Sequence, residues 1–510
     1  MKPHPLSLGA LILPGLLLAA PVEVNGRWTG ELTMEGKTHP LVIEITGDPG
    51  QLQATYAADD RAPKSFKIVE DGPAGLKLVT TGGSFFAGRI QEETYTGRYQ
   101  HDAKRSGTFR ARRTPATIPA VALDGAYRSS TGEVWVVSRS DAGLFLGNTT
   151  NGWARALRPA GSGRFVFGSS LLDEKTIAGT VEFAGRDQLS VTMGDQAGFA
   201  GTRVPFTEEA IRFENEGAVL SGRLTLPAGP GPFPAVVLLH GSGPQVGGEP
   251  WSHALVADGF AVLSFDKRGS GKSTGPGWRA SFETYANDAL AAIATLHRRK
   301  DIKPDHIGLY GPSQGGYIAL LAASKSTDVG FVIIRSTAAV PPQQQEEYRL
   351  GKLLEIQGYS VADVATARAF VHTKFNAPVT GDWAAYESAA DRARSEKWFE
   401  TMGGSPARDH PAHEFWRQNG RLDPLPMLAR LHIPILWLTP EFDESSPIAE
   451  TVAALKAAPG EIAHLIIPGA DHGMLATSGF HVTDENLAGA PGYAPEFLPS
   501  IRRWLANNAR

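Results

Sequence analysis

A serine that could act as a nucleophile lies between two glycines in the second half of this 510-residue chain. Residues 307–323 read IGLYGPSQGGYIALLAA, which is an apolar run, a glycine-bounded serine and a series of helix formers. This order predicts a strand, a sharp turn and a helix, with Gly311, Ser313 and Gly315 in the pattern G-x-S-x-G. The glycines leave room for a tight turn that lifts the Ser313 hydroxyl clear of the sheet. Such a hydroxyl can attack a carbonyl carbon when a base activates it.

At this turn the sequence resembles the α/β-hydrolase superfamily, in particular exported bacterial-type esterases and acylaminoacyl-peptidase-like hydrolases with N-terminal β modules. The resemblance covers roughly residues 211–510. It implies an α/β-hydrolase fold, with a mostly parallel sheet flanked by helices and a helical cap, preceded by an all-β N-terminal region. It also implies that Ser313 is a nucleophile and that an acid and a histidine follow later in the chain.

The expected acid is Asp443. An apolar run at residues 433–438 predicts a buried strand, and a carboxylate is needed in the loop that follows it. By resemblance, the acid lies four residues before Pro447, at Asp443. Glu441 and Glu444 are the competing carboxylates in this loop, and solvation at the surface explains both.

The expected base is His472. It follows the apolar run His464-Leu-Ile-Ile467 in the loop Pro-Gly-Ala-Asp-His-Gly. The order Ser313, Asp443, His472 is the chain order of the superfamily, and each residue follows a predicted strand. Asp471 is expected to face away from the site, and His464 to belong to its strand.

Backbone N–H groups that could stabilise an oxyanion are expected from two places. The loop His240-Gly-Ser-Gly243 follows another apolar run and resembles the HGGG-type oxyanion loop of esterases, with Ser242 in place of a glycine. By resemblance, the donors are Gly241 or Ser242 together with Gln314. His240 precedes the nucleophile in the chain, so we expect a structural role for it.

A second G-x-S-x-G pattern, with Ser273 at its centre, lies in the glycine-rich loop at residues 269–277, where no helix can follow directly. This loop lacks the first glycine of a phosphate-binding P-loop, because Asp266 stands there. The run D-x-R-G-x-G-x-S that begins at Asp266 recurs in the superfamily. Its implied role is structural, with Asp266 and Arg268 expected to pair.

The remaining elements of the hydrolase region alternate as a parallel sheet requires. Residues 285–297 are expected to form a helix that presents Leu290, Ile293, Ala294 and His297 on one face. Residues 341–428 are expected to form a helical cap. Its aromatic residues either line a substrate pocket or pack the cap: Trp383, Tyr386, Trp398, Phe399, Phe415 and Trp416.

Four segments are expected: a signal peptide at 1–20, β-sandwich or barrel modules at 21–115 and 116–205, and the hydrolase domain at 206–510. Short alternating runs punctuated by Gly, Asp and Pro predict the β modules. Trp28, Trp135 and Trp153 could line a ligand site, but we expect them to fill the module cores. Lys2, a short apolar run and Leu-Ala-Ala predict export to the periplasm or outside the cell, with cleavage favoured over a retained anchor.

Composition limits the partners. The chain is 42% hydrophobic and 20% charged, with a net charge of -4, which gives no general attraction to nucleic acid or acidic membranes. It has no cysteine, which removes thiol catalysis and disulfides. The expected chemistry needs no cofactor and no metal. The expected partner is a small-molecule ester or peptide, with no stable membrane insertion after signal cleavage.

Three functions remain open at this stage. The leading hypothesis is a carboxylic-ester hydrolase that works through an acyl-enzyme. The second is a serine peptidase of the aminopeptidase or acylaminoacyl-peptidase type, which would need Glu346, Glu347 or Asp382 to anchor a substrate amine. The third is a cell-envelope binding protein with a vestigial hydrolase domain. Acyl preference, oligomeric state and the role of the β modules do not follow from the sequence.

Overall fold

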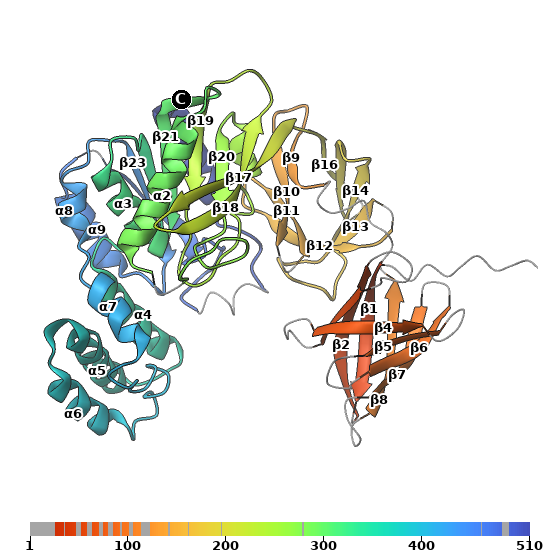
Figure 1. Cartoon of the computed structure of the whole chain (residues 1–510). Coiled ribbons are helices and arrows are strands. Elements are labelled where there is room, and N and C mark those ends of the chain that lie inside the picture. The colour runs from red at the N-terminus through yellow and green to blue at the C-terminus, as the bar shows by residue number, and fades with distance from the viewer. Residues whose placement is uncertain are drawn as a thin grey trace, which may run out of the picture. The chain divides into compact units, whose positions relative to one another are not determined.

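The computed structural model describes residues 26–509 except 35, 47–52, 59–63, 71–74, 80–84, 92–93, 101–105, 114–122, 141–142, 162, 195, 278–279, 461 and 482–488. The expected signal peptide at 1–20 lies outside the described residues. The chain forms two compact units, Met1–Thr117 and Ile118–Arg510 (Figure 1).

The described part of the first unit is a closed barrel in which consecutive strands pair antiparallel. Period-two alternation sends every second side chain inward. Trp28 is fully buried and its ring lies 6.0 Å from that of Tyr95, which confirms the expected core role. The strands are β1 Gly26–Met34, β2 Lys37–Thr46, β3 Gln53–Ala58, β4 Lys64–Glu70, β5 Gly75–Val79, β6 Phe85–Gln91, β7 Thr94–Gln100 and β8 Ser106–Arg113.

The second unit begins with another closed barrel, which β16 completes by pairing with β9. Trp135 is buried and stacks on Phe199 with 4.9 Å between ring centroids, while Trp153 packs edge-on against Phe167. Both tryptophans therefore serve the barrel core. The strands are β9 Gly125–Arg128, β10 Val134–Ser140, β11 Gly143–Asn148, β12 Ala154–Pro159, β13 Arg164–Phe167, β14 Gly179–Ala184, β15 Gln188–Met193 and β16 Gln196–Arg203.

The rest of the second unit is built on an eight-stranded sheet of order β17-β18-β20-β19-β21-β22-β23-β24. The entering hairpin β17–β18 runs antiparallel to its neighbour β20, and the pairs from β20 to β24 are parallel. The strands are β17 Phe206–Asn215, β18 Ala218–Pro227, β19 Phe233–Leu238, β20 Ala261–Phe265, β21 Ile302–Pro312, β22 Phe331–Arg335, β23 Ile435–Phe442 and β24 Ile462–Asp471.

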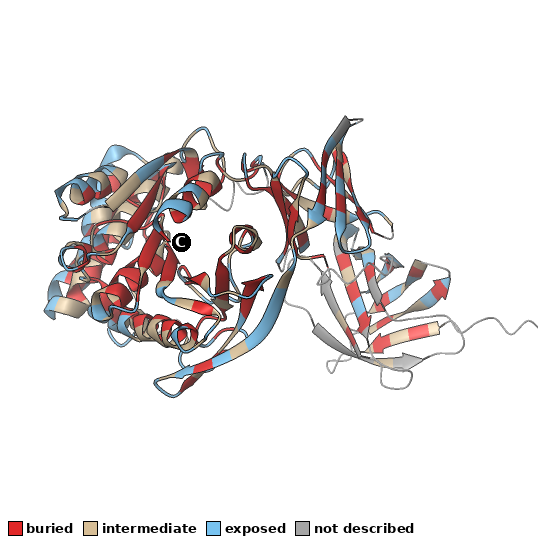
Figure 2. Cartoon of the chain, turned by 90° about the horizontal axis from the view of Figure 1, so that it is seen from above, coloured by how far each residue is buried: buried red, intermediate tan, exposed pale blue. Residues whose placement is uncertain are grey.

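Both faces of this sheet are covered, which explains its continuous apolar strands. Along β19, Val237 belongs to one buried cluster while Val236 and Leu238 belong to the opposite one. The first face carries α2 Phe282–His297, α3 Gln314–Lys325, α8 Pro424–Leu428 and α9 Ile448–Ala457, and the second carries α1 His253–Ala257 and α11 Phe497–Asn508. Viewed from above, the buried residues follow the strands (Figure 2).

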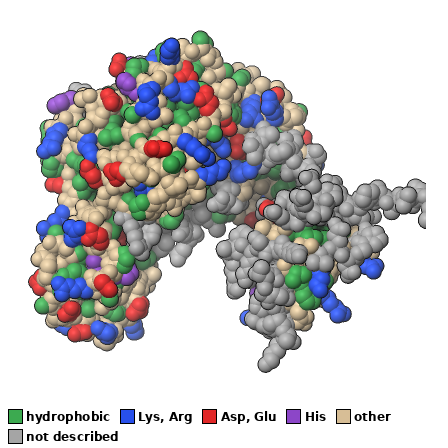
Figure 3. All heavy atoms as spheres, viewed as in Figure 1, with side chains coloured by type: hydrophobic (Ala, Val, Ile, Leu, Met, Phe, Trp, Pro, Cys, Tyr) green, Lys and Arg blue, Asp and Glu red, His purple; other side chains and the backbone are tan. Residues whose placement is uncertain are grey.

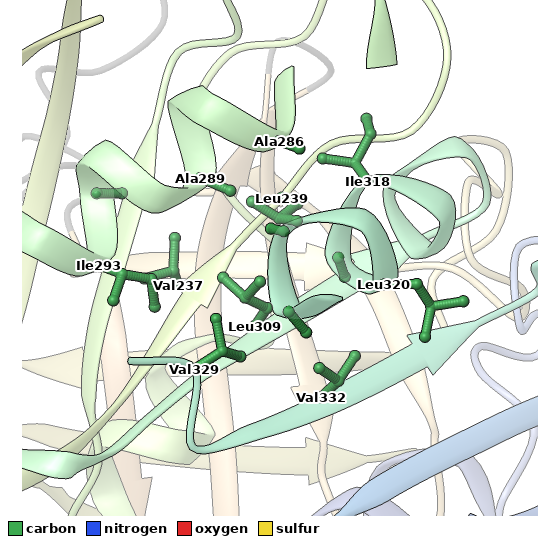
Figure 4. Packing of buried hydrophobic residues seen from close by; sticks show 14 of the residues in the cluster. Val237, Leu239, Ala286, Ala289, Ile293, Leu309, Ile318, Leu320, Val329 and Val332 are labelled. Atoms are coloured by element: carbon green, nitrogen blue, oxygen red, sulfur yellow. The ribbon is translucent and has the colours of Figure 1, made fainter. Parts of the chain in front are cut away.

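The buried face of helix α2 matches the expected one only in part. Ala286, Ala289 and Ile293 point into the cluster (Figure 4), whereas His297 is exposed. Ile293 lies on the buried face as expected and Leu290 packs against the cluster, whereas the expected burial of His297 was wrong. Three alanines of α2 are fully buried against α3 and the sheet, and their small size lets the helix approach closely.

The segment between β22 and β23 is helical, with α4 Pro342–Ile356, α5 Val361–Thr380, α6 Trp383–Ala393 and α7 Pro411–Asn419 preceding α8. Figure 1 shows α5 and α6 grouped away from the sheet, with α4 and α7 between. These helices have a separate apolar core that contains Tyr386, Trp398 and Phe399, with Trp383 packed against it. For these four aromatic residues, packing is therefore the correct interpretation.

On the face drawn in Figure 3, acidic and basic side chains of the described residues are interspersed. Among the helices that the structure describes, none is both long and apolar enough to cross a membrane.

Candidate active site

Ser313 lies at the turn between β21 and α3 and has a strained backbone, with φ 51° and ψ -118°. The two flanking glycines permit this turn. A Cβ on Gly311 would lie 2.2 Å from the carbonyl oxygen of Gly315, and one on Gly315 would lie 2.8 Å from that of His240. Any side chain at these positions would push the turn apart. The sequence thus folds into a strand, a sharp turn and a helix that presents one hydroxyl.

The structure brings Ser313, Asp443 and His472 together from three different loops. The Ser313 Oγ lies 3.1 Å from His472 Nε2, and His472 Nδ1 lies 2.8 Å from Asp443 Oδ1. Asp443 is fully buried, and its Oδ1 also accepts the N–H groups of Ser445 and Ser446. These donors fix the carboxylate toward the imidazole. A hydroxyl bonded to an imidazole that is itself bonded to a carboxylate has the connectivity needed for nucleophilic attack.

The carboxylate also sets the basicity of the imidazole. Burial alone would lower the pKa of His472, but the charge of Asp443 and its hydrogen bond outweigh burial and raise that pKa above its ordinary value. A base with a raised pKa accepts a hydroxyl proton more readily.

The backbone of His472 is held by groups that the sequence analysis missed. Its carbonyl oxygen accepts hydrogen bonds from Arg335 Nη1 at 2.9 Å and Ser336 Oγ at 2.7 Å. Its N–H donates to Glu444 Oε2 at 3.3 Å. Glu444 is only 9% exposed, so its expected surface role was wrong. The available signal was the polar pair Arg335-Ser336 at the end of the buried strand β22.

Of the three expected oxyanion donors, Gly241 is excluded by its partner. Its N–H donates to Gln245 Oε1 at 3.0 Å, so it is already occupied. Within the described residues, the backbone N–H groups of Ser242 and Gln314 make no hydrogen bond, and both residues line the pocket in front of Ser313. Gln314 is the first residue of α3, where backbone N–H groups lack helical partners.

Lys267 lies directly behind this loop and was also missed. Its Nζ donates to the carbonyl oxygens of Gly241 at 2.6 Å and Gly243 at 3.0 Å, and to Gln314 Oε1 at 2.8 Å. The side chain thereby ties the loop after β19 to the start of α3. Burial lowers the pKa of Lys267 to about 8. Lys267 occupies the variable position x of the motif D-x-R-G, so the motif did not indicate its role.

The expected ion pair between Asp266 and Arg268 does not form. Arg268 Nε instead donates to Asp288 Oδ2 at 2.9 Å, with both side chains buried. Asp266 accepts the N–H groups of Gly247 and Lys272 and so shapes the loop. The Asp288 carboxylate on α2 reaches the buried guanidinium, whose Nη2 also donates to the carbonyl oxygen of Asn215 at 3.0 Å.

Two further residues have the structural roles expected of them. His240 Nε2 lies 2.6 Å from the carbonyl oxygen of Phe265, and burial lowers its pKa to about 4. Ser273 is buried and donates to the carbonyl oxygen of Asp266 at 2.6 Å, so its hydroxyl is engaged with the backbone.

A pocket of about 570 Å³ opens in front of Ser313 and His472. Its aromatic walls come from α2, α3 and α7: Phe282, Tyr317, Phe415 and Trp416. Phe415 and Trp416 are therefore the two aromatic residues of the expected cap that reach the pocket. The mainly apolar walls suit an acyl or aromatic group.

Of the three expected amine anchors, only Glu346 lines the pocket. Its carboxylate accepts two hydrogen bonds from Arg349, at 2.7 Å and 2.6 Å. Glu347 pairs with His372, and Asp382 accepts the N–H of Ala385 at the start of α6. Glu347 and Asp382 are therefore engaged away from the pocket.

The fold of this domain and the arrangement of its site residues are of the α/β-hydrolase type. The chain belongs to the X-Pro dipeptidyl-peptidase (S15 family), whose sequence profile matches residues 216–474. Among curated relatives, it is 32% identical over 152 residues to esterase EstD of Thermotoga maritima, covering 28% of this chain and 35% of EstD. It is 34% identical over 121 residues to thiohydrolase aneE of Aspergillus aculeatus, covering 23% of this chain and 37% of aneE.

The chain thus spans about a third of the length of these two relatives. Among solved structures, an esterase of Pyrococcus furiosus matches 60% of this chain and 92% of its own, at 15% identity and a TM-score of 0.39.

Proposed function

We propose that this protein is a serine hydrolase that cleaves carboxylic esters through an acyl-enzyme. Ser313 is the nucleophile, His472 the general base and Asp443 the acid that orients the imidazole. The observation that carries the proposal is the unbroken chain of hydrogen bonds from Ser313 Oγ through the ring of His472 to Asp443.

In the first step His472 Nε2 takes the Ser313 proton while Oγ bonds to the ester carbonyl carbon. The carbonyl oxygen becomes an oxyanion, which the N–H groups of Ser242 and Gln314 stabilise. His472 then donates the proton to the leaving alcohol as the ester C–O bond breaks. Water, deprotonated by His472, attacks the acyl-enzyme and releases the acid, which restores Ser313. None of these steps requires a metal or an organic cofactor.

Ester cleavage is favoured over peptide cleavage by the pocket. Its mainly apolar walls suit an acyl group, and the carboxylate of Glu346 is already bonded to Arg349. The match to esterase EstD, although it covers 28% of this chain, supports the same choice.

The test compares kcat/KM for an aminoacyl ester, the matching aminoacyl anilide and a short acyl ester. We expect ester turnover to dominate and to fall roughly 10⁴-fold or more in Ser313→Ala, because no other group replaces the nucleophile. Thermal unfolding of the variant checks that it is folded. Ester turnover that survives in folded Ser313→Ala contradicts the proposal.

The S15 family match favours a peptidase as the second candidate. In that case the Glu346 carboxylate would release Arg349 and bind the substrate amine instead. Glu346→Gln would then reduce turnover of the aminoacyl anilide and leave the short acyl ester unaffected. Glu347→Gln is the matched control, because Glu347 bonds to His372 and Gln343 outside the pocket. Anilide turnover comparable with ester turnover, together with this selective loss, would replace the esterase proposal.

The third hypothesis, a cell-envelope binding protein with a vestigial hydrolase domain, predicts no acylation of Ser313.

Export to the periplasm or beyond, with the segment 1–20 removed, is part of the proposal and is tested by the N-terminal sequence of the protein recovered from a cell fraction.

A further inference from the structure

Lys267 carries a buried positive charge without a counter-ion. The side chain is 3% exposed, and within the described residues no carboxylate oxygen lies within 4.0 Å of its Nζ. Its three acceptors are neutral: two backbone carbonyls and one side-chain amide. Burying a cation among neutral groups is costly, so an unpaired buried lysine beside a reactive serine calls for a functional explanation.

The hydrogen bond to Gly241 gives Lys267 a route to the reaction. The carbonyl group of Gly241 and the N–H of Ser242 belong to the same planar peptide unit. A cation 2.6 Å from that carbonyl oxygen draws electron density away from the nitrogen, which strengthens the N–H as a donor. The second bond, to Gln314 Oε1, holds the residue whose backbone N–H is the other candidate donor.

We propose that Lys267 is a positioning residue whose charge orients and polarises the peptide between Gly241 and Ser242, and so stabilises the oxyanion formed at Ser313. This inference rests on the proposed function. Lys267 does not contact the substrate, and its effect passes through the two backbone N–H groups. The developing negative charge is the counter-ion that the lysine lacks in the free protein.

Other charged or titratable groups face Lys267 from each neighbouring element. The ring of Tyr285 on α2 lies 4.8 Å from Nζ, and burial raises the pKa of Tyr285 to about 12. His240 at the end of β19, whose pKa is about 4, stays neutral above pH 6 or so. Asp266 and the pair of Arg268 with Asp288 lie in or against the same loop. The lowered pKa of Lys267, about 8, falls between pH 7 and 9.

The test replaces the charge and keeps most of the volume, using Lys267→Met. The matched control is Lys272→Met, because Lys272 is an exposed lysine of the same loop. For each variant, kcat and KM are measured on the best ester. Inhibition constants are measured for a trifluoromethyl ketone, which forms an anionic adduct with a serine, and for the corresponding methyl ketone.

We expect Lys267→Met to lower kcat roughly 10²-fold, comparable with losing one oxyanion donor, with KM changed less than about twofold. Binding of the trifluoromethyl ketone should weaken by a similar factor, whereas the methyl ketone and the control variant stay as in the wild type. A purely structural lysine would weaken both ketones equally. That result, or unchanged kcat in Lys267→Met, overturns the proposal.

A measurement on the wild type covers the case in which Lys267→Met does not fold. Because the pKa of Lys267 is lowered to about 8, its charge is lost as pH rises through that value. We expect kcat at pH 9 to be roughly one tenth of its value at pH 7. A kcat that is flat from pH 7 to 9.5 contradicts the proposal. A failure of the proposed function has a different result. Ester turnover would then remain at the wild-type level in Ser313→Ala, and no oxyanion would form at Ser313 for Lys267 to stabilise.

Discussion

Arg155 of the second barrel donates a hydrogen bond from Nη1 to the carbonyl oxygen of Pro491, at 2.7 Å. The neighbouring Tyr493 donates its N–H to the carbonyl oxygen of Gly152 in the same barrel, also at 2.7 Å. Segment 490–494 in turn pairs with the residues after His472: Ala494 donates to Met474 at 2.8 Å. The barrel formed by β9–β16 therefore supports the loop that carries the expected base.

This contact predicts that a change in the barrel impairs catalysis. Arg155→Met should lower kcat/KM for the ester roughly 10- to 100-fold, because a small displacement of the base is enough to weaken proton transfer. Arg164→Met is the control, since Arg164 lies on the same barrel and pairs at the surface with Glu182. Equal activity of both variants, with Arg155→Met correctly folded, would show that the barrel does not position the loop.

Removing the charge of Asp443 should change both the rate and its pH dependence. Asp443→Asn should reduce kcat by about 10³–10⁴-fold, because the amide no longer holds the required tautomer or stabilises the imidazolium. In the wild type, activity should fall with acid as His472 is protonated, with a midpoint above the ordinary histidine pKa of 6.5. In the variant this midpoint should move down. A pH-rate profile of each protein measures both effects. An unchanged midpoint would show that a group other than His472 causes the loss of activity in acid.

The buried pair of Arg268 and Asp288 should matter for stability. Asp288→Asn leaves the Arg268 guanidinium, which is 1% exposed, without its counter-charge. We expect a loss of about 3–5 kcal/mol in the free energy of unfolding by urea. Asp301→Asn is the control, because it breaks the partly exposed pair with Arg299 and should cost less than about 1 kcal/mol.

The double variant Arg268→Met/Asp288→Leu separates the lost pair from the unpaired charge. It should recover much of the stability lost in Asp288→Asn, because neither side chain then buries a charge. Equal losses of unfolding free energy in Asp288→Asn and Asp301→Asn would show that the buried pair of Arg268 and Asp288 has no special role in stability.

The nucleophile turn and the order of the loops were accessible to sequence analysis because each depends on local chemistry. The turn requires glycine at 311 and 315, because a Cβ there would lie only 2.2 Å and 2.8 Å from a backbone carbonyl oxygen. Apolar strands precede each expected site residue. The roles of Ser313, Asp443 and His472 stay predictions, although the structure places their side chains within hydrogen-bond distance.

The groups that support these side chains were not accessible, because their partners are remote in sequence. Arg335 reaches His472 across 137 positions, and Lys267 reaches Gln314 across 47. The engagement of the Gly241 N–H by Gln245 is local but depends on a side-chain rotamer. The pairing of Arg268 with Asp288, rather than with Asp266, depends on how α2 packs beside the loop.

The central claim is that Ser313 is the residue that becomes acylated. The most direct measurement is intact mass and peptide mapping of the full chain after reaction with a fluorophosphonate, which traps an activated serine covalently. We predict one adduct per chain, located on Ser313 and absent from Ser313→Ala and from His472→Ala. No adduct on folded wild-type protein, or an adduct on Ser273 or Ser242 in place of Ser313, would contradict the account.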